Sequence, residues 1–507
     1  MKKALLIFLC FVSYTPLISQ DFNGYALYNK QNNNTAYLID KDGNIAKTWN
    51  CNVPCNYAVL LKDNGNIIRG GEYSGNQLTG AAIGGMVQEI NPAGNVVWEY
   101  TYSNNNHCSH HDITLIGDNV LLTAWEVKTT NELTQAGYDG ASSDKWPTHF
   151  VEIAQNGSSG QIVWEWHIWD HLIQDHNPSK DNYGVVANHP ELIDINMIAA
   201  TGGGPGGGGP GGGSGDWFHV NGVDYNADLD QIAFSSRHSS EIYIIDHSTT
   251  SAQAATHAGG NSGMGGDILY RWGNPSNYGA SGSQIITAAV HDIRWIPDDG
   301  RPNGGFLQMF NNSGNNGSSA IDAIDTPKNG YTYNVTLGSA FTPSSYTWRH
   351  NCLGSASGQS AHNTMSNGNT FVNLSGGQGG AGYMYEVDQN DNVVWQYNGG
   401  GPAKAFRYEC EHLGIINLLN NPCGVGLSQI SSKNISIYPN PSTGLFTING
   451  LNEDSKILIY NSIGQQLINN SSLNNTIDLN HQPNGIYFIK INPNEENQMV
   501  KTISIIK

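Results

Sequence analysis

The sequence has few charged residues, and cationic residues are especially scarce. Only 13% of its 507 residues are charged, with 23 Lys and Arg against 42 Asp and Glu, so the formal net charge is −19. Phosphate backbones repel a chain this acidic, which excludes nucleic acid as a partner. An anionic substrate would have to be drawn by a local cluster of histidine and arginine rather than by the field of the whole protein.

Two common catalytic motifs are also missing. The glycine tract over residues 201–215 lacks the Lys-Ser/Thr ending of a phosphate-binding loop and follows no strand-to-helix unit. No Gly-x-Ser-x-Gly elbow occurs in a strand-to-helix context. We therefore expect no cofactor, and we interpret the tract as a surface loop, an inert insertion between repeats rather than a flap over a site.

A long apolar run occurs only at the N-terminus. The segment MKKALLIFLCFVSYTPLISQ carries two lysines, an apolar stretch and the small residue Ser19 before Gln20. This pattern predicts a cleaved signal peptide over residues 1–19, too short to span a membrane with its present flanks. We expect an exported protein with no transmembrane segment in its mature form.

Cysteine is rare, and one of the seven cysteines, Cys10, lies inside the signal peptide. The six that remain are Cys51, Cys55, Cys108, Cys352, Cys410 and Cys423. An even number of cysteines in an exported chain favours disulfides. Cys51 with Cys55 and Cys410 with Cys423 are the plausible local pairs, although spacing does not fix the connectivity. A zinc site at Cys51-x-x-x-Cys55 is disfavoured, because no second pair has zinc-finger spacing.

Glycine, asparagine and serine are abundant, and they separate strands that follow a repeated pattern. An apolar residue, an acid, a Gly/Asn turn and Val-Val-Trp recur, as in QEINPAGNVVWEY and YEVDQNDNVVWQY. Repeats of ~40–50 residues with four short strands each indicate a β-propeller, whose blades bury their faces by stacking in a ring. We predict an all-β protein with a six-bladed propeller over residues 23–420, and seven blades as the alternative. Residues 25–49 and 406–419 should share the last blade.

Histidine recurs at one phase of this repeat, just ahead of the first alternating strand of four units. In a propeller the first strand of each blade lines the central channel, so equivalent positions should face one mouth. A single histidine there could equally cap a turn, but that explanation is weaker for a set of four. We therefore expect four imidazoles to converge, those of His111, His219, His291 and His362.

The composition changes again after Gly424. Beyond a linker over residues 421–434, residues 435–507 form β segments separated by Pro-Asn, Gly and Asn-Gly turns, which predicts a small β-sandwich. The segments IYPNPSTG, IYNSIGQ and LNHQPNGIYFIKI resemble the type A C-terminal sorting domain of the type IX secretion system in order and spacing. This resemblance implies passage through the periplasm to the cell surface or medium by the type IX machinery, with removal of the tail.

The propeller segments resemble a second family. DWFHVNGVDYNADLDQIAF from Asp216, VHDIRW from Val290 and FNN from Phe310 are similar to segments of the arylsulfotransferases. Members of that family are six-bladed propellers that move a sulfuryl group from one phenol to another without a nucleotide cofactor. The resemblance implies an aryl-sulfate sulfotransferase that is independent of PAPS and takes an aryl sulfate donor and a phenolic acceptor.

The resemblance carries site residues over only in part. His219 matches the family histidine of the WxHxN segment, His291 matches that of the VHD segment, and Arg237 lies in the shared SSRH segment, where it is the expected cation for sulfuryl oxygens. The arginine after the family's FDN turn is replaced here by SGNNGSS, and the later-blade histidine that acts as the nucleophile is not found at its strand. The nucleophile is therefore left to His362 or His111.

Two other classes of function fit the same residues. The four converging imidazoles could bind zinc, copper or iron, with Asp112 and Asp292 orienting their neighbours His111 and His291. A non-catalytic surface propeller that binds a glycan or another protein would suit the Asn-rich, weakly charged composition. Both remain alternatives to sulfuryl transfer.

Overall fold

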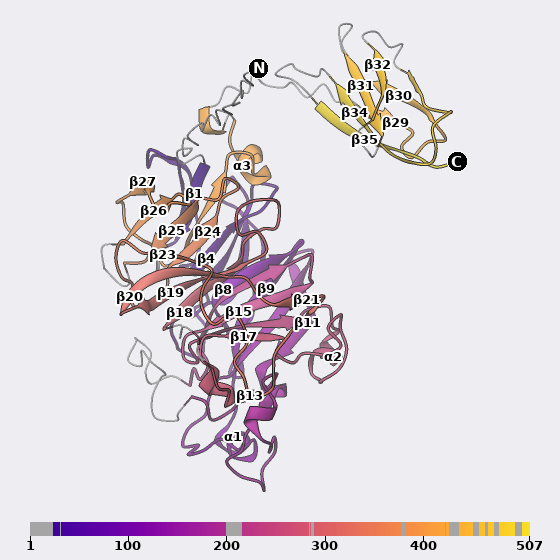
Figure 1. Cartoon of the computed structure of the whole chain (residues 1–507). Coiled ribbons are helices and arrows are strands. Elements are labelled where there is room, and N and C mark those ends of the chain that lie inside the picture. Colours follow the sequence, from indigo (N-terminus) through magenta and orange to yellow (C-terminus); the bar gives the residue numbers. More distant parts are fainter. Residues whose placement is uncertain are drawn as a thin grey trace, which may run out of the picture. The chain divides into compact units, whose positions relative to one another are not determined.

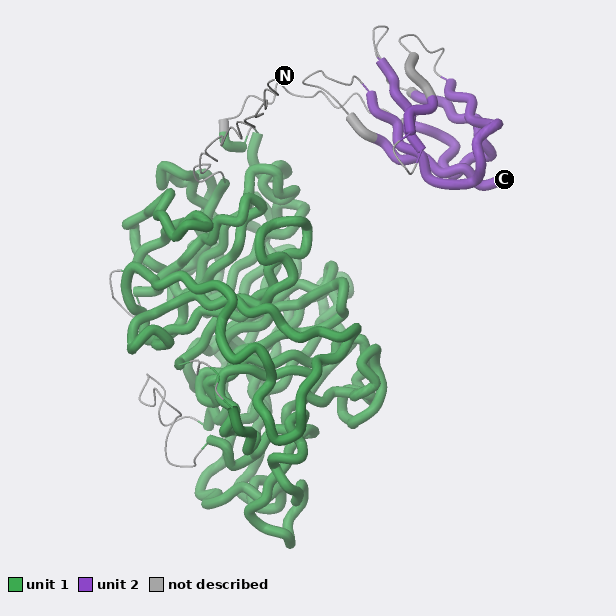
Figure 2. Tube along the Cα trace, viewed as in Figure 1, with its two compact units in different colours: residues 1–423 green, residues 424–507 purple. Residues whose placement is uncertain are grey.

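The protein is described from a computed structural model, which covers residues 24–30, 32–198, 215–282, 284, 288–376, 382–420, 422–424, 436–449, 456–461, 465–470, 476–491 and 499–507. The predicted signal peptide, the glycine tract up to Ser214 and nearly all of the predicted linker lie outside these residues. The chain divides into two compact units, residues 1–423 and residues 424–507 (Figure 2).

The first unit contains six four-stranded antiparallel sheets, the blades of a propeller (Figure 1). The first blade contains β4 (Cys55–Leu61), β5 (Ile67–Glu72), β6 (Gly85–Ile90) and β7 (Val96–Thr101). The second contains β8 (His107–Ile116), β9 (Asn119–Glu126), β10 (Thr148–Asn156) and β11 (Ser159–His167). The third contains β14 (Val220–Asn226), β15 (Gln231–Ser236), β16 (Glu241–Asp246) and β17 (Tyr270–Trp272). The prediction of a six-bladed propeller is confirmed.

The remaining blades follow the same plan. The fourth contains β18 (Val290–Trp295), β19 (Leu307–Asn315), β20 (Ser318–Ile324) and β23 (Trp348–Asn351). The fifth contains β24 (Ala361–Thr364), β25 (Thr370–Leu374), β26 (Tyr383–Val387) and β27 (Val393–Tyr397). The sixth contains β28 (Ala405–Glu409), β1 (Gly24–Asn29), β2 (Thr35–Ile39) and β3 (Ile45–Asn50), in that order.

The sixth blade closes the ring, because its inner strand comes from the end of the unit and its other three strands come from the beginning. β28 pairs antiparallel with β1, with Tyr408 opposite Tyr25. This pairing ties the last strand of the unit to its first, and the blade edges that remain in a propeller are short and protected. The inner strands β4, β8, β14, β18, β24 and β28 contact one another in this order around the ring.

Tryptophans near the outer edges of four blades explain part of the repeated Val-Val-Trp pattern. Each indole Nε1 donates to a backbone carbonyl in the next blade around the ring. These bonds are Trp98 to Ser159 at 2.7 Å, Trp166 to Gly266 at 2.7 Å, Trp272 to Pro343 at 2.7 Å and Trp395 to Lys41 at 2.6 Å. The pattern therefore supplies both strand structure and a repeated link between neighbouring blades.

Short elements fill the connections between strands. They include the helices α1 (Thr130–Gln135), α2 (Ser251–Ala254) and α3 (Leu413–Leu418). They also include the 3-10 turns η1 (Ile168–Asp170), η2 (Val186–Asn188), η3 (Pro275–Tyr278) and η4 (Pro422–Gly424). Two small pairs complete the unit, β12 (Leu172–Ile173) with β13 (Ile193–Asp194) and β21 (Lys328–Asn329) with β22 (Thr332–Tyr333). Within the described residues, no helix is long and apolar enough to cross a membrane.

One of the two expected disulfides is present. Cys410 is bonded to Cys423 and ties the segment after β28 to the end of the unit. The expected Cys51–Cys55 pair is wrong, because both residues are free buried thiols. Cys51 ends one blade and Cys55 begins the next, and their sulfurs lie against different carbonyls, those of Trp49 and Ala58.

The second unit is a small two-sheet β domain. One sheet contains β29 (Ser436–Tyr438), β30 (Leu445–Asn449) and β33 (Thr476–Asp478), and the other contains β31 (Ile457–Asn461), β32 (Gln466–Asn470), β34 (Gly485–Ile491) and β35 (Met499–Ile505). Phe446 and Ile448 from the first sheet pack with Ile459 and Ile489 from the second. Because apolar and polar residues alternate along these strands, the two sheets bury an apolar core that belongs to this unit alone.

Candidate active site

The inner strands of four blades are interrupted by β-bulges or register shifts close to the residues that the sequence singled out. The shifts fall in β4, β8, β14 and β18. Three residues there have left-handed backbones, His111 with φ 50°, His219 with φ 54° and Asp292 with φ 47°. A bulge redirects side chains that a regular strand would alternate, and such strain is maintained where the surrounding structure fixes it.

His219 is held by an acidic partner three residues before it. Its Nδ1 lies 2.6 Å from Asp216 Oδ2, and its backbone N–H donates to Asp216 Oδ1 at 3.1 Å. Burial alone would raise the pKa of Asp216, but His219 and its neighbours hold that pKa far below the ordinary range. Because the ionised carboxylate only accepts hydrogen bonds, Nδ1 carries the proton and Nε2 is left with the lone pair.

His291 has the same arrangement with a different acceptor. Its Nδ1 donates to the Ala289 carbonyl oxygen at 2.7 Å, which again leaves Nε2 without a proton in the neutral ring. Burial, then the charge of Arg237, lowers the pKa of His291 well below its ordinary value. The imidazole is therefore neutral at neutral pH.

Arg237 and His291 are neighbours around Gly358. A methyl group placed on Gly358 would lie 3.0 Å from Arg237 Nη1 and 3.7 Å from His291 Nε2. The absence of a side chain at Gly358 therefore lets its backbone lie close to both nitrogens.

His111 joins the same cluster. Its ring lies 4.6 Å from that of His219, centroid to centroid, and its Nδ1 is 2.8 Å from His110 Nδ1. His110 in turn stacks on Trp125 with 4.1 Å between centroids. Burial, together with the neighbouring histidines, lowers the pKa of His111 well below the ordinary value. His238 lies next to His219, 4.8 Å between ring centroids.

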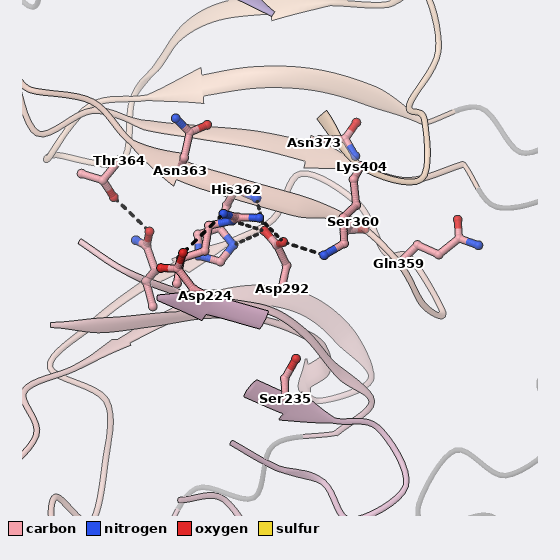
Figure 3. Close-up of polar contacts among 12 residues, drawn as sticks. Asp224, Ser235, Asp292, Gln359, Ser360, His362, Asn363, Thr364, Asn373 and Lys404 are labelled. Atoms are coloured by element: carbon pink, nitrogen blue, oxygen red, sulfur yellow. Dashed lines mark hydrogen bonds and ion pairs between the residues drawn. The ribbon is translucent and has the colours of Figure 1, made fainter. Parts of the chain in front are cut away.

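A buried ionic network near these histidines ties four inner strands together. Figure 3 shows its members Asp292, His362 and Lys404. Lys404, just before β28, places Nζ 2.7 Å from Asp112 Oδ2 and 2.9 Å from Asp292 Oδ1. Arg294 approaches Asp292 at 3.2 Å and stacks over the Phe406 ring at 3.9 Å. Burial favours neutral Asp292, but Arg294 and Lys404 outweigh it and hold its pKa well below the ordinary range. The network joins blades that lie far apart in the sequence.

Asp112 and Asp292 therefore have a different role from the one expected. The sequence placed them as partners that orient His111 and His291, whereas their carboxylates pair with Lys404. The left-handed backbone at His111 and Asp292 breaks the simple alternation on which that expectation rested.

His362 lies in this network rather than beside Arg237. It is fully buried, its Nδ1 is 3.3 Å from Asp292 Oδ2, and its backbone N–H donates to the same oxygen at 2.8 Å. Figure 3 shows the ring next to Asp292. Of the five residues predicted from the sequence, the structure thus gathers His111, His219, His291 and Arg237 and places His362 against the ionic network.

The imidazoles of this cluster do not form a compact metal-ligand set. Among the residues that the structure describes, three donor atoms from His, Cys, Asp or Glu come within 4.8 Å of one another only at His171, His257 and Asp267. These residues lie elsewhere in the unit.

Sequence reasoning missed Asp216, His110 and Lys404. Asp216 was visible as an acid three residues before His219, but only the folded turn shows that it bonds the ring. Lys404 occupies the place of the histidines at the start of the sixth inner strand, and a search for histidine alone passes over it. His110 precedes His111, and strand alternation would point the two in opposite directions.

Solved structures match the chain at low sequence identity and low TM-score. A protein of unknown function from Bacteroides caccae is 11% identical with a TM-score of 0.42, covering 76% of this chain and 99% of its own. The periplasmic gluconolactonase of Pseudomonas aeruginosa is 10% identical with a TM-score of 0.35, covering 95% and 99% respectively. No curated protein matches the chain.

Two family models match the sequence. The model described as a secretion system C-terminal sorting domain matches residues 436–507, so the protein is directed to the cell surface or outside the cell. The model described as arylsulfotransferase (ASST) matches residues 9–337, which is more than half of the chain. The chain therefore belongs to the arylsulfotransferase family.

Proposed function

We propose that this protein transfers a sulfuryl group from an aryl sulfate to a phenol in two displacements, with His219 as the nucleophile. One observation carries the proposal: Nδ1 of His219 is bound by Asp216 and Nδ1 of His291 by a carbonyl, so both rings present Nε2 as the reacting atom. A neutral imidazole can accept the strongly electrophilic sulfuryl group covalently. Family membership supports sulfuryl transfer in general.

In the first displacement, His219 Nε2 attacks the sulfur of the donor. The S–N bond forms as the S–O bond to the aryl ring breaks, and the phenolate leaves. The sulfated ring is then cationic, and Asp216, 2.6 Å from Nδ1, stabilises that charge. Arg237 is the nearby cation for the sulfuryl oxygens.

In the second displacement, the acceptor phenol gives its proton to His291 Nε2, and its oxygen attacks the sulfur. The new S–O bond forms as the S–N bond breaks, which restores neutral His219. His291 then releases that proton to solvent and is neutral again before the next cycle. Its lowered pKa keeps Nε2 free to take the proton at neutral pH.

His362 and His111 are less suited to be the nucleophile. His362 is fully buried beside Asp292 and has no exposed surface to offer a donor. His111 has its Nδ1 against another imidazole, which provides no fixed charge to stabilise a sulfated ring. His111 fits a supporting role next to His219.

The test uses the purified protein, 4-nitrophenyl sulfate as donor and phenol as acceptor. Nitrophenolate release should rise when phenol is added, and His219→Ala and His291→Ala should each lower turnover about a hundredfold or more. Asp216→Asn should lower kcat about tenfold with little change in KM, because the substitution removes the charge that stabilises the sulfated His219 ring and leaves donor binding unchanged. His176→Ala, at a side chain 45% exposed, is the matched control and should be unchanged.

Mass spectrometry of quenched protein locates the intermediate. A sulfuryl group on His219 that disappears in His219→Ala supports the assignment, whereas a sulfuryl group on His362 or His111 overturns it. If the folded protein turns over no aryl sulfate, a binding propeller is the better interpretation. Stoichiometric metal at the histidine cluster would favour the metal-dependent alternative.

A further inference from the structure

Two histidines and an aspartate meet at a point that the proposed reaction does not use. His171 follows η1, in the long connection between the second and third blades, while His257 and Asp267 bracket the glycine-rich loop between α2 and β17. Asp267 Oδ1 lies 2.8 Å from His171 Nδ1 and 2.7 Å from His257 Nδ1. The donor atoms of all three residues lie within 4.8 Å of one another.

The hydrogen bonds of His171 fix the orientation of its ring. Nε2 lies 2.8 Å from the Ala254 carbonyl oxygen, and a carbonyl only accepts, so Nε2 carries the proton. In the neutral ring, Nδ1 then directs a lone pair at a carboxylate oxygen. That contact requires a positive charge between the two atoms, supplied either by a metal ion or by a second proton.

This arrangement is typical of metal-ligating histidine. Ligating imidazoles generally donate their other N–H to a backbone carbonyl or carboxylate, which fixes the tautomer and aims the lone pair at the ion. Here the Ala254 carbonyl oxygen accepts the other N–H of His171, and the ring also stacks on Trp166 with 5.6 Å between centroids. His171 is thus held in place before any ion arrives.

Glycine at position 266 makes this close approach possible. A methyl group there would lie 2.0 Å from the Ala254 carbonyl oxygen and 2.6 Å from His171 Nε2. The Trp166 indole also donates to the Gly266 carbonyl oxygen at 2.7 Å. The loop that carries His257 and Asp267 is therefore fixed against the buried ring.

The three residues also differ in exposure in a way that allows an ion to enter. The His171 side chain is fully buried and that of Asp267 is 7% exposed, whereas that of His257 is 62% exposed. One ligand on the surface leaves a path from solvent and an open position for water. Two imidazoles and one carboxylate favour zinc or a similar transition-metal ion over Mg²⁺ and Ca²⁺, which prefer oxygen ligands.

We propose that His171, His257 and Asp267 bind one Zn²⁺ or similar transition-metal ion, which fastens the glycine-rich loop of the third blade to the connection that leaves the second. Ligands of a tetrahedral zinc lie ~3.4 Å apart, so small movements of these side chains suffice. The site is structural, since its residues belong to the packing between blades and not to the histidine cluster of the proposed reaction. It is independent of that reaction.

The test uses the full chain without an affinity tag, stripped of metal by a chelator and titrated with Zn²⁺ against a chromogenic chelator. We expect one tightly bound equivalent and a rise in the thermal unfolding midpoint. His257→Ala should weaken binding at least tenfold and abolish the thermal shift, and it should fold normally because the side chain is exposed. His257→Cys, which keeps a zinc ligand, should restore both.

His189→Ala is the matched control, because His189 and Glu191 form a similar histidine-acid contact at 2.8 Å on the surface. It should bind and respond to Zn²⁺ as the wild type does. Binding that survives in His257→Ala would overturn the proposal, as would the absence of a bound equivalent in the wild type. In the second case the three residues form only a hydrogen-bonded triad.

Discussion

At the scale of single residues, the hydrogen bond at Nδ1 sets which ring nitrogen His219 and His291 present with a lone pair. The repeat phase was enough to predict that His111, His219 and His291 come together. It did not predict how each ring is oriented, because that depends on Asp216 and the Ala289 carbonyl, which meet the rings only through left-handed turns. His362 has the same phase, yet its β24 has no bulge and its ring turns to Asp292.

A methyl group at position 358 should test where the sulfuryl group binds. In Gly358→Ala the new carbon would lie 3.0 Å from Arg237 Nη1 and 3.7 Å from His291 Nε2, against two groups of the proposed donor site. We expect kcat/KM for 4-nitrophenyl sulfate to fall at least tenfold, while the thermal midpoint changes little. Gly94→Ala, at a glycine with nothing within 4 Å, controls for the added methyl group, although its left-handed backbone makes it slightly destabilising. Unchanged kinetics in Gly358→Ala would place the donor elsewhere.

The buried histidines should make the protein sensitive to mild acid. Burial lowers the pKa of His110 to about 3, and burial followed by the charge of His219 lowers that of His238 to about 4. In the unfolded chain both histidines bind protons below about pH 6.5, whereas in the folded chain they resist protonation until a lower pH. The stabilising contribution of the two neutral, buried rings is therefore present above about pH 6.5 and is lost as the pH falls toward 4. Urea midpoints should therefore be lower at about pH 5 than at about pH 7.5, and His238→Gln should reduce the difference.

Two other histidines have the opposite effect on stability, because they stabilise the folded protein at low pH. Burial lowers the pKa of His167 and His247, but Glu126 and Glu152 outweigh it and raise both values. Their stabilising contribution is present at low pH and is lost as the pH rises. A urea midpoint that increases steadily from pH 7.5 to 5 would show that these pairs dominate, contrary to our expectation.

At the scale of elements, alternation and turn residues were sufficient to predict the blades, because a strand with one periodic face and a Gly/Asn turn has few other solutions. The bulges in the inner strands were not predictable, since they arise from pairing with the next strand and from the approach of neighbouring blades. Lys404 is the clearest case: only ring closure brings it to Asp112, which lies 292 positions earlier in the chain.

Removing the Lys404 charge should therefore destabilise the ring. Lys404→Met leaves Asp112 and Asp292 buried with one cation fewer, and breaking a buried ionic contact in this way costs about 3–5 kcal/mol. Chemical denaturation should show a reduced free energy of unfolding, and adding Asp112→Asn should recover part of it. Lys41→Met, in an exposed pair with Asp42, should change stability by less than about 1 kcal/mol. Equal effects of the two lysine variants would contradict a buried network.

At the scale of the whole molecule, the propeller and the sorting domain are separate compact units with separate cores. The change in composition after Gly424 was enough to suggest this division. We expect the secreted form to begin near Gln20 and to end before the sorting domain. Deleting residues 436–507 should leave a folded propeller with an unchanged thermal midpoint, but one retained in the periplasm. Intact mass and cell fractionation check both outcomes, and surface display of the truncated chain would contradict the second.

The pairing of β28 with β1 also sets an order of events during export. Translocation from the N-terminus delivers β1 early, but β1 receives its inner neighbour only when residues 405–409 arrive, after five complete blades. The sorting domain follows almost at once, from residue 436. A chain cut short at any earlier point therefore lacks both the strand that closes the ring and the signal for release. Every chain that carries the sorting signal therefore also carries the strand that closes its ring.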